Sequence, residues 1–237
     1  MSSPARFFAR RCCQNDDALE RRRSQIDSAI SRVPTITASF AVRESFRDIM
    51  PMAVHLLPGP FTVDAYHRLA ELGVFDEDDR VELLDGQIVA MTPIGGAHAA
   101  CVIRLTDLLS RRRGSDTSVS VQNPVVLAER WEPQPDIVVL RRPGGLAGAW
   151  LPTPKDVLLV IEVADMSLER DRDVKIPGYA AAGIPEAWLV DLATDAISMY
   201  RAPGPEGYGD VITVPRGETL RPLLLPGVSI TAVEILG

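Results

Sequence analysis

Residues 157–163 read VLLVIEV, an apolar run that is interrupted by a single carboxylate, Glu162. A continuous run of leucine and β-branched residues is typical of a strand that is covered on both faces. An unpaired carboxylate buried in such a strand would destabilise the fold by several kcal/mol. We therefore expect Glu162 to lie next to a cation.

Two other segments supply candidate partners for Glu162. Residues 134–140, QPDIVVL, place Asp136 after a proline at the start of a second apolar strand. Lys175 comes at the predicted start of a helix over about residues 175–182, close to the end of the Glu162 strand. Pro177 fits this helix only in the first turn, where its missing N–H is not needed.

Composition limits the class of protein. The 237 residues are 46% hydrophobic, enough for one ordinary domain with a real core. The apolar runs fall far short of the roughly 20 residues of a membrane helix, and no signal segment is apparent, so we expect a cytoplasmic protein. A net charge of −7 argues against a protein that binds nucleic acid through a broad positive surface. Three cysteines without a paired spacing predict reduced thiols.

Residues 1–55 differ from the rest in being rich in arginine and serine, without sustained periodicity. We expect little fixed structure there and one domain over residues 56–237. Met50 and Met52 lie just before the first clear structural signal. We therefore hypothesise that one of them is the true start of the protein.

A helix and a hairpin are predicted next. Thr62 is a plausible N-cap for an amphipathic helix that ends at Gly73. In residues 80–91, RVELLDGQIVAM, the Asp-Gly pair is the two-residue loop that type I′ hairpins favour. Glu82 then shares a face with apolar neighbours, so it is either a site residue or an edge carboxylate that reaches solvent.

Residues 97–113 form the first long predicted helix, which closes at Gly114. His98 falls in its first turn, where it could cap the helix, pack, or face an anion. Residues 111–113, all arginine, complement the C-terminal end of the helix dipole, and a nucleic-acid role is the alternative.

The remaining segments predict more strands. They lie at residues 119–127, 136–140 and 184–192, and at ISMYRA, DVITVP and GVSITAV near the C-terminus, with a glycine- and proline-rich loop over residues 141–154. Strands and helices interleave without strict alternation. The predicted fold class is therefore α/β (α+β), with a mixed central sheet flanked by helices and an N-terminal β-hairpin.

These motifs together resemble the Uma family of putative restriction endonucleases, within the PD-(D/E)XK nucleases. The resemblance covers about residues 58–235. It rests on FTVDAYHRLAE (61–71), RVELLDGQIV (80–89), PDIVVL (135–140) and IEVADMSLERDRDVKIPGYAAAGIPEAWLVD (161–191). The usual lysine position, two residues after the acid, is Ala164 here, and in the family the lysine has moved to the following helix, which matches Lys175. At the position where the family has an aromatic residue, this sequence has Ala187. The segment before Phe61 has no counterpart in the family.

The resemblance implies a restriction-endonuclease-like fold and a nuclease that uses Mg²⁺ or Mn²⁺. Carboxylates holding such an ion can activate water and relieve charge on a phosphodiester. Asp136 and Glu162 are the expected ligands, with Glu82 a third. Lys175 is expected to act on the attacking water or on the developing charge. Gln134 and His98 are accessory candidates, while Asp165 and Asp171 either tune Lys175 or face solvent.

Two other interpretations stay open. The acids and the lysine could form a buried Glu162–Lys175 ion pair, with Asp136 capping a loop. Alternatively, the chain could be a nuclease fold without catalysis that serves as a binding or assembly module. The expected partner is a nucleic-acid substrate, with DNA expected rather than RNA, no membrane role is expected, and a homodimer is left open.

Overall fold

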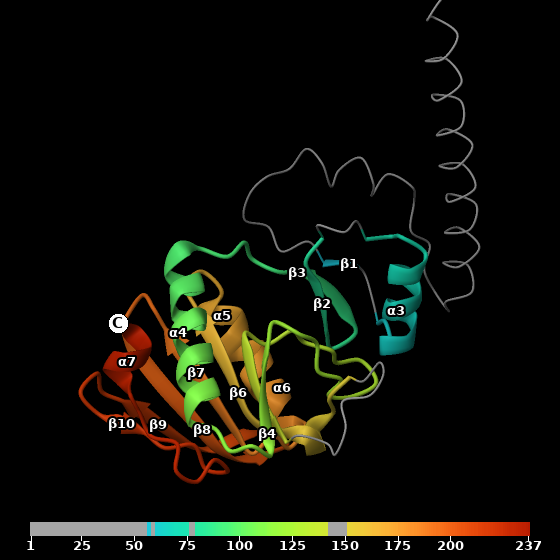
Figure 1. Cartoon of the computed structure of the whole chain (residues 1–237). Coiled ribbons are helices and arrows are strands. Elements are labelled where there is room, and N and C mark those ends of the chain that lie inside the picture. The colour runs from blue at the N-terminus through green and yellow to red at the C-terminus, as the bar shows by residue number, and fades with distance from the viewer. Residues whose placement is uncertain (1–55, 58–59, 76–78, 142–150) are drawn as a thin grey trace, which may run out of the picture. The chain divides into compact units, whose positions relative to one another are not determined.

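The computed structural model describes residues 56–57, 60–75, 79–141 and 151–237 (Figure 1). The expectations for residues 1–55, for the start at Met50 or Met52, and for most of the loop over residues 141–154 lie outside these ranges. The described residues belong to two compact units, one with residues 64–75 and 79, the other with residues 56–63, 80–141 and 151–237. All candidate site residues belong to the second unit.

Helix α3 (Val63–Glu71) confirms the first predicted helix. It ends where the sequence predicts, because Gly73 adopts a φ of 67° and its amide bonds the carbonyl of Ala70 at 2.9 Å. A left-handed glycine just after the last turn is a common helix stop. Within the same unit, the rings of Tyr66 and Phe75 pack with their centroids 5.7 Å apart.

The predicted hairpin is also confirmed. Strands β2 (Val81–Leu84) and β3 (Gln87–Ala90) are antiparallel. Asp85 and Gly86 have φ values of 45° and 75°, as a type I′ loop requires. The register pairs Glu82 with Val89, which sets Glu82 on the apolar face that the sequence indicated. Strand β1 (Leu56–Leu57) adds to the β3 edge.

The main sheet has six strands in the order β4-β5-β6-β7-β8-β9. Only β6 and β7 run parallel, and every other neighbouring pair is antiparallel. The strands are β4 (Thr117–Val121), β5 (Ile137–Arg141), β6 (Val157–Ala164), β7 (Glu186–Asp191), β8 (Ala196–Gly204) and β9 (Gly207–Val214). All residues of β6 are buried, which agrees with its apolar sequence.

The prediction of a strand over residues 119–127 is wrong in its bounds. Strand β4 starts at Thr117 and ends at Val121. The chain then turns because Gln122 adopts a φ of 52°, and Pro124 has no N–H with which to continue a ladder.

The connection from β6 to β7 is helical for longer than predicted. It starts with a short helix, α5 (Leu168–Arg170), and continues through the π-helical turn η2 (Asp171–Lys175) into α6 (Ile176–Ala181). The π turn bonds the Ile176 amide to the Asp171 carbonyl five residues earlier. Lys175 is therefore inside a helical run, and the wider turn lies directly before Pro177, whose ring disturbs regular helical bonding.

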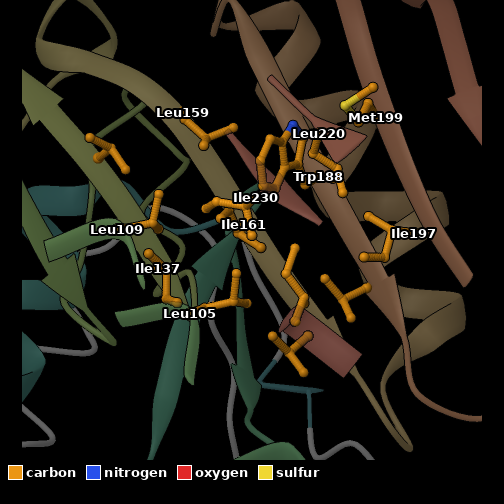
Figure 2. Packing of buried hydrophobic residues seen from close by; sticks show 14 of the residues in the cluster. Leu105, Leu109, Ile137, Leu159, Ile161, Trp188, Ile197, Met199, Leu220 and Ile230 are labelled. Carbon is orange, nitrogen blue, oxygen red and sulfur yellow. The ribbon is translucent and has the colours of Figure 1, made fainter. Parts of the chain in front are cut away.

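Two apolar cores lie on opposite faces of the main sheet. Helix α4 (Gly96–Arg112) and the C-terminal helix α7 (Ala232–Leu236) contribute to the first core, which is shown in Figure 2. Helix α6 contributes to the second core. Alternate residues of β6 enter the two cores, so Leu159 and Ile161 face α4, while Val160 and Ala164 face α6. Glu162 therefore points toward α6.

The C-terminal segment is less regular than predicted. The segment GVSITAV gives only the short strand β11 (Ile230–Thr231), which pairs with β10 (Thr219–Leu220) and runs into α7. Arg112 forms an ion pair with Glu234 of α7, and Arg111 pairs with Asp107. These contacts within the protein agree with a structural role for the arginines.

Candidate functional site

Asp136 and Glu162 are brought together by the pairing of β5 with β6. The register places Ile137 opposite Ile161, so Asp136 and Glu162 are the next cross-strand neighbours. The Asp136 amide donates to Glu162 Oε2 at 3.3 Å. Both carboxylates are buried, with exposed fractions of 8% and 1%.

Lys175 supplies the cation that the sequence demanded. Its Nζ lies 3.2 Å from Glu162 Oε1, 3.0 Å from Glu82 Oε2 and 3.9 Å from Asp171 Oδ1. The lysine is itself buried, with 4% exposure. The prediction that Glu162 meets a cation is thus confirmed, and Lys175 is shared among several acids.

Glu82 is placed beside these residues by backbone bonds to a distant loop. Leu83 exchanges two backbone hydrogen bonds with Glu132, at 2.8 and 3.2 Å. The backbone N–H of Gln134 donates to Glu82 Oε2 at 3.1 Å. The side-chain Nε2 of Gln134 donates to the Val81 carbonyl at 3.0 Å. Glu82 is 1% exposed, so the interpretation as an edge carboxylate in solvent is wrong. Gln134 holds the hairpin in place.

Asp136 is held by donors on several elements. His98 Nε2 lies 3.0 Å from Asp136 Oδ2, which also accepts from the Val163 amide at 2.9 Å. Gln122 Nε2 donates to Oδ1 at 3.2 Å. His98 comes from α4 and Lys175 from the helical run before α6, so the two acids are approached from helices on opposite faces of the sheet. The roles considered for His98 were capping the helix, packing or facing an anion, and the structure pairs it with the Asp136 carboxylate.

Sequence reasoning missed Tyr179 and Gln122, and it left two alternatives open for Asp171. Tyr179 donates from its hydroxyl to Glu162 Oε1 at 2.5 Å, and its position four residues after Lys175 on a helix was a usable signal. Gln122 follows a strand that was predicted to continue, so it gave no signal. Asp171 is 3% exposed, and the view of it as a solvent-facing acid is wrong, whereas Asp165 is exposed.

Burial and mutual repulsion control protonation in this cluster. Complete burial raises the pKa of Glu162 to about 8, against the attraction of Lys175. Burial likewise raises the pKa of Asp171. Burial alone would lower the pKa of Lys175, but the surrounding carboxylates, Glu162 first, hold it above its usual value. For Asp136, burial favours the neutral acid, yet the hydrogen bond and charge of His98 keep its pKa below the usual value.

The clustered residues line a cavity of about 230 Å³. Its acidic members are Glu82, Asp136, Glu162, Asp165 and Asp171, and its basic members are Arg80, His98, Arg170 and Lys175. Ile94 and Met166 are further lining residues, both exposed. The cavity can therefore admit a small polar group next to the buried acids.

The acids fit a divalent cation in their chemistry. Mg²⁺ and Mn²⁺ prefer oxygen ligands and keep several waters, so a few carboxylates are sufficient. Asp136, Glu162 and Glu82 all line the cavity. They now pair with Lys175 and His98, and no group of three or more His, Cys, Asp or Glu in the described ranges is arranged to hold a metal ion. Binding of such an ion therefore requires side chains of this cluster to shift from the positions described here.

Comparison with solved structures supports the fold. A crystal structure of a putative nuclease belonging to DUF820 from Anabaena variabilis ATCC 29413 is similar, with a TM-score of 0.60 and 15% sequence identity. The match covers 75% of this chain and 98% of that chain. At this identity the similarity establishes the fold alone, which is a mixed α/β fold. A comparison with curated proteins gave no match.

No helix in the described part of the chain has the length and apolarity needed to cross a bilayer. Cys101 is a buried free thiol, while the other two cysteines lie outside the described ranges.

The family model Uma2, described as "Putative restriction endonuclease", matches residues 63–233. This range holds all of the acids and the lysine described above. The chain belongs to the Uma2 family of putative restriction endonucleases.

Proposed function

We propose that the protein is a divalent-metal-dependent endonuclease that hydrolyses phosphodiester bonds, with DNA as its substrate. The observation that carries this proposal is the meeting of Asp136, Glu162 and Lys175 in one cavity, from segments far apart in the sequence. Membership of the Uma2 family of putative restriction endonucleases supports it, as does the fold shared with a protein described as a putative nuclease.

The chain's own residues suit the steps of such a reaction. Asp136, Glu162 and Glu82, the last directly or through water, would hold Mg²⁺ or Mn²⁺, which when bound lowers the pKa of water and offsets phosphate charge. Lys175 would orient the attacking water or stabilise charge developing on the phosphate oxygens. His98 and Gln122 keep Asp136 in place through their hydrogen bonds.

Two arginines at the cavity supply contacts for a phosphodiester, although acids outnumber bases in the cavity lining and the net charge is −7. Arg80 and Arg170 both line the cavity. Guanidinium groups bind phosphate oxygens in a fixed planar geometry. A nucleic acid would thus be attracted by these two side chains and by the bound cation, without a broad basic surface.

The direct test is cleavage of plasmid, single-stranded DNA and RNA in Mg²⁺, in Mn²⁺ and in EDTA. We expect cleavage of DNA with either metal and none in EDTA. Lys175→Ala should lower the rate by about 10²–10³-fold, the usual cost of removing one group that stabilises the transition state. Lys155→Ala removes an exposed lysine and is the matched control, with an unchanged rate. Failure of the wild type to cut any substrate with either metal would contradict the proposal.

The second candidate is a binding or assembly module that keeps the fold without catalysis. One observation favours it: the acids of the site are paired with Lys175 and His98, so the charges are partly satisfied without a metal. Nucleic acid that is bound but never cut, in Mg²⁺ or in Mn²⁺, would favour this candidate over the nuclease.

A further inference from the structure

Tyr179 occupies a distinctive position on the helical run that follows β6. Asp171, Lys175 and Tyr179 are spaced four residues apart, and all three side chains are buried. The Tyr179 ring packs in the second core, and its side chain is fully buried. The same helical run thus carries the lysine of the site and, one turn later, a phenol.

The Tyr179 hydroxyl has Glu162 as its partner, with a donor–acceptor distance of 2.5 Å to Oε1. Lys175 approaches the same oxygen, but it also contacts Glu82 and Asp171. The other oxygen of Glu162, Oε2, accepts from the Asp136 amide. The donors to Oε1 are therefore of two kinds, one shared with other acids and one directed at Glu162.

We infer that Tyr179 is a positioning residue, which fixes the orientation of the Glu162 carboxylate for the reaction proposed above. Glutamate has several rotatable bonds, and a fixed donor on one oxygen removes much of that freedom. If Lys175 leaves Glu162 to contact a water or a phosphate, the Tyr179 hydroxyl still donates to Glu162 Oε1. A phenylalanine could fill the same volume of the core without a buried hydroxyl to satisfy, so the hydroxyl is the informative group. The inference rests on the proposed function.

The test is Tyr179→Phe, which keeps the ring and removes the hydroxyl. Tyr208→Phe is the matched control, because the Tyr208 hydroxyl donates to the Ile184 carbonyl at 2.9 Å and does not contact the acids of the site. Mn²⁺ affinity is measured by calorimetry on each full-length protein after circular dichroism has verified the fold. Removing a hydrogen bond to a charged group should weaken Mn²⁺ binding by about tenfold or more in Tyr179→Phe, and leave it unchanged in Tyr208→Phe.

Cleavage kinetics give a second measurement. At saturating Mn²⁺ we expect Tyr179→Phe to lower kcat for DNA while KM stays within about twofold, since a misoriented ligand affects the transition state more than substrate binding. Mn²⁺ affinity and kcat both equal to those of the wild type would overturn the positioning role alone. A wild type that binds no Mn²⁺ would overturn the proposed function and the positioning role together.

Discussion

Two buried glutamates in the main sheet differ in their surroundings. Glu186, at the start of β7, is fully buried and accepts from Trp188 Nε1 at 2.8 Å and from Arg201 Nη2 at 2.9 Å through Oε1. Its Oε2 accepts from the Leu223 amide. One acid thus has one cation and a full set of donors, as a structural ion pair requires.

Glu162 lies on the neighbouring strand β6, where several acids share one lysine. Three buried acids, Glu82, Glu162 and Asp171, lie within 3.9 Å of a single lysine, Lys175. A fourth buried acid, Asp136, is paired with His98, and all of these residues line one cavity. The excess of negative charge there is not neutralised by Lys175 alone. A glutamate that only stabilised the fold would need no such excess, so the contrast supports the proposed role of Glu162 in a metal site.

The largest expected difference is in stability. Glu186→Ala should lower the free energy of unfolding by about 3–5 kcal/mol, because it leaves the Arg201 charge and the Trp188 and Leu223 N–H groups unpaired. Glu162→Ala should cost less than Glu186→Ala, although it leaves the Tyr179 hydroxyl and the Asp136 amide without their acceptor. The reason is that Lys175 keeps Glu82 as a partner and the remaining acids lose a source of mutual repulsion. Urea unfolding at pH 7 measures both. Equal losses would make Glu162 another structural ion-pair member.

The next comparison is the effect of a bound metal ion on the thermal stability of variants at the two glutamates. Mn²⁺ at about a hundred times its dissociation constant adds roughly 2.7 kcal/mol to the stability of the wild type, a rise in melting midpoint of roughly 5 °C or more. Glu162→Gln should abolish this rise, while Glu186→Gln should keep it, provided that both variants are folded before Mn²⁺ is added. The measurement is a thermal melt with Mn²⁺ and with EDTA. An identical rise in both variants would place the cation elsewhere.

The last comparison between the two glutamates is the pH dependence of stability. The pKa of Glu162 is raised from 4.5 to about 8 by burial, so between these values the folded state binds more protons than the unfolded state. Stability from this group is therefore present below about pH 4.5 and is lost as the pH rises through about 8, with a slope of at most about 1.4 kcal/mol per pH unit.

Glu162→Gln should make that slope shallower, whereas Glu186→Gln should leave it as in the wild type. Urea unfolding at several pH values from 5 to about 8.5 gives both slopes. A slope in Glu162→Gln as steep as that of the wild type would assign the pH dependence to other groups of the cluster.

Local sequence was sufficient to predict several of the helices and strands. The Asp85-Gly86 pair determined the hairpin because few residues tolerate positive φ at both loop positions. The apolar run of β6 and the periodic stripe of α4 determined a covered strand and an amphipathic helix. The lone acid of β6 also determined that a cation must be near, because a buried charge without a partner is too unfavourable to persist.

Tertiary structure decided which groups meet. Glu82 and Lys175 are 93 positions apart (175 − 82), and their contact depends on the pairing of Leu83 with Glu132 and on the π turn before Pro177. Gln122 reaches Asp136 through a positive φ that periodicity does not encode. The spacing of Tyr179 from Lys175 was visible in the sequence, but its contact with Glu162 depends on the packing of that helical run against β6. Hydrophobic patterns specify which face of each element is buried, whereas the sharing of one lysine among several acids is set by long-range packing and by the electrostatics of a desolvated cluster.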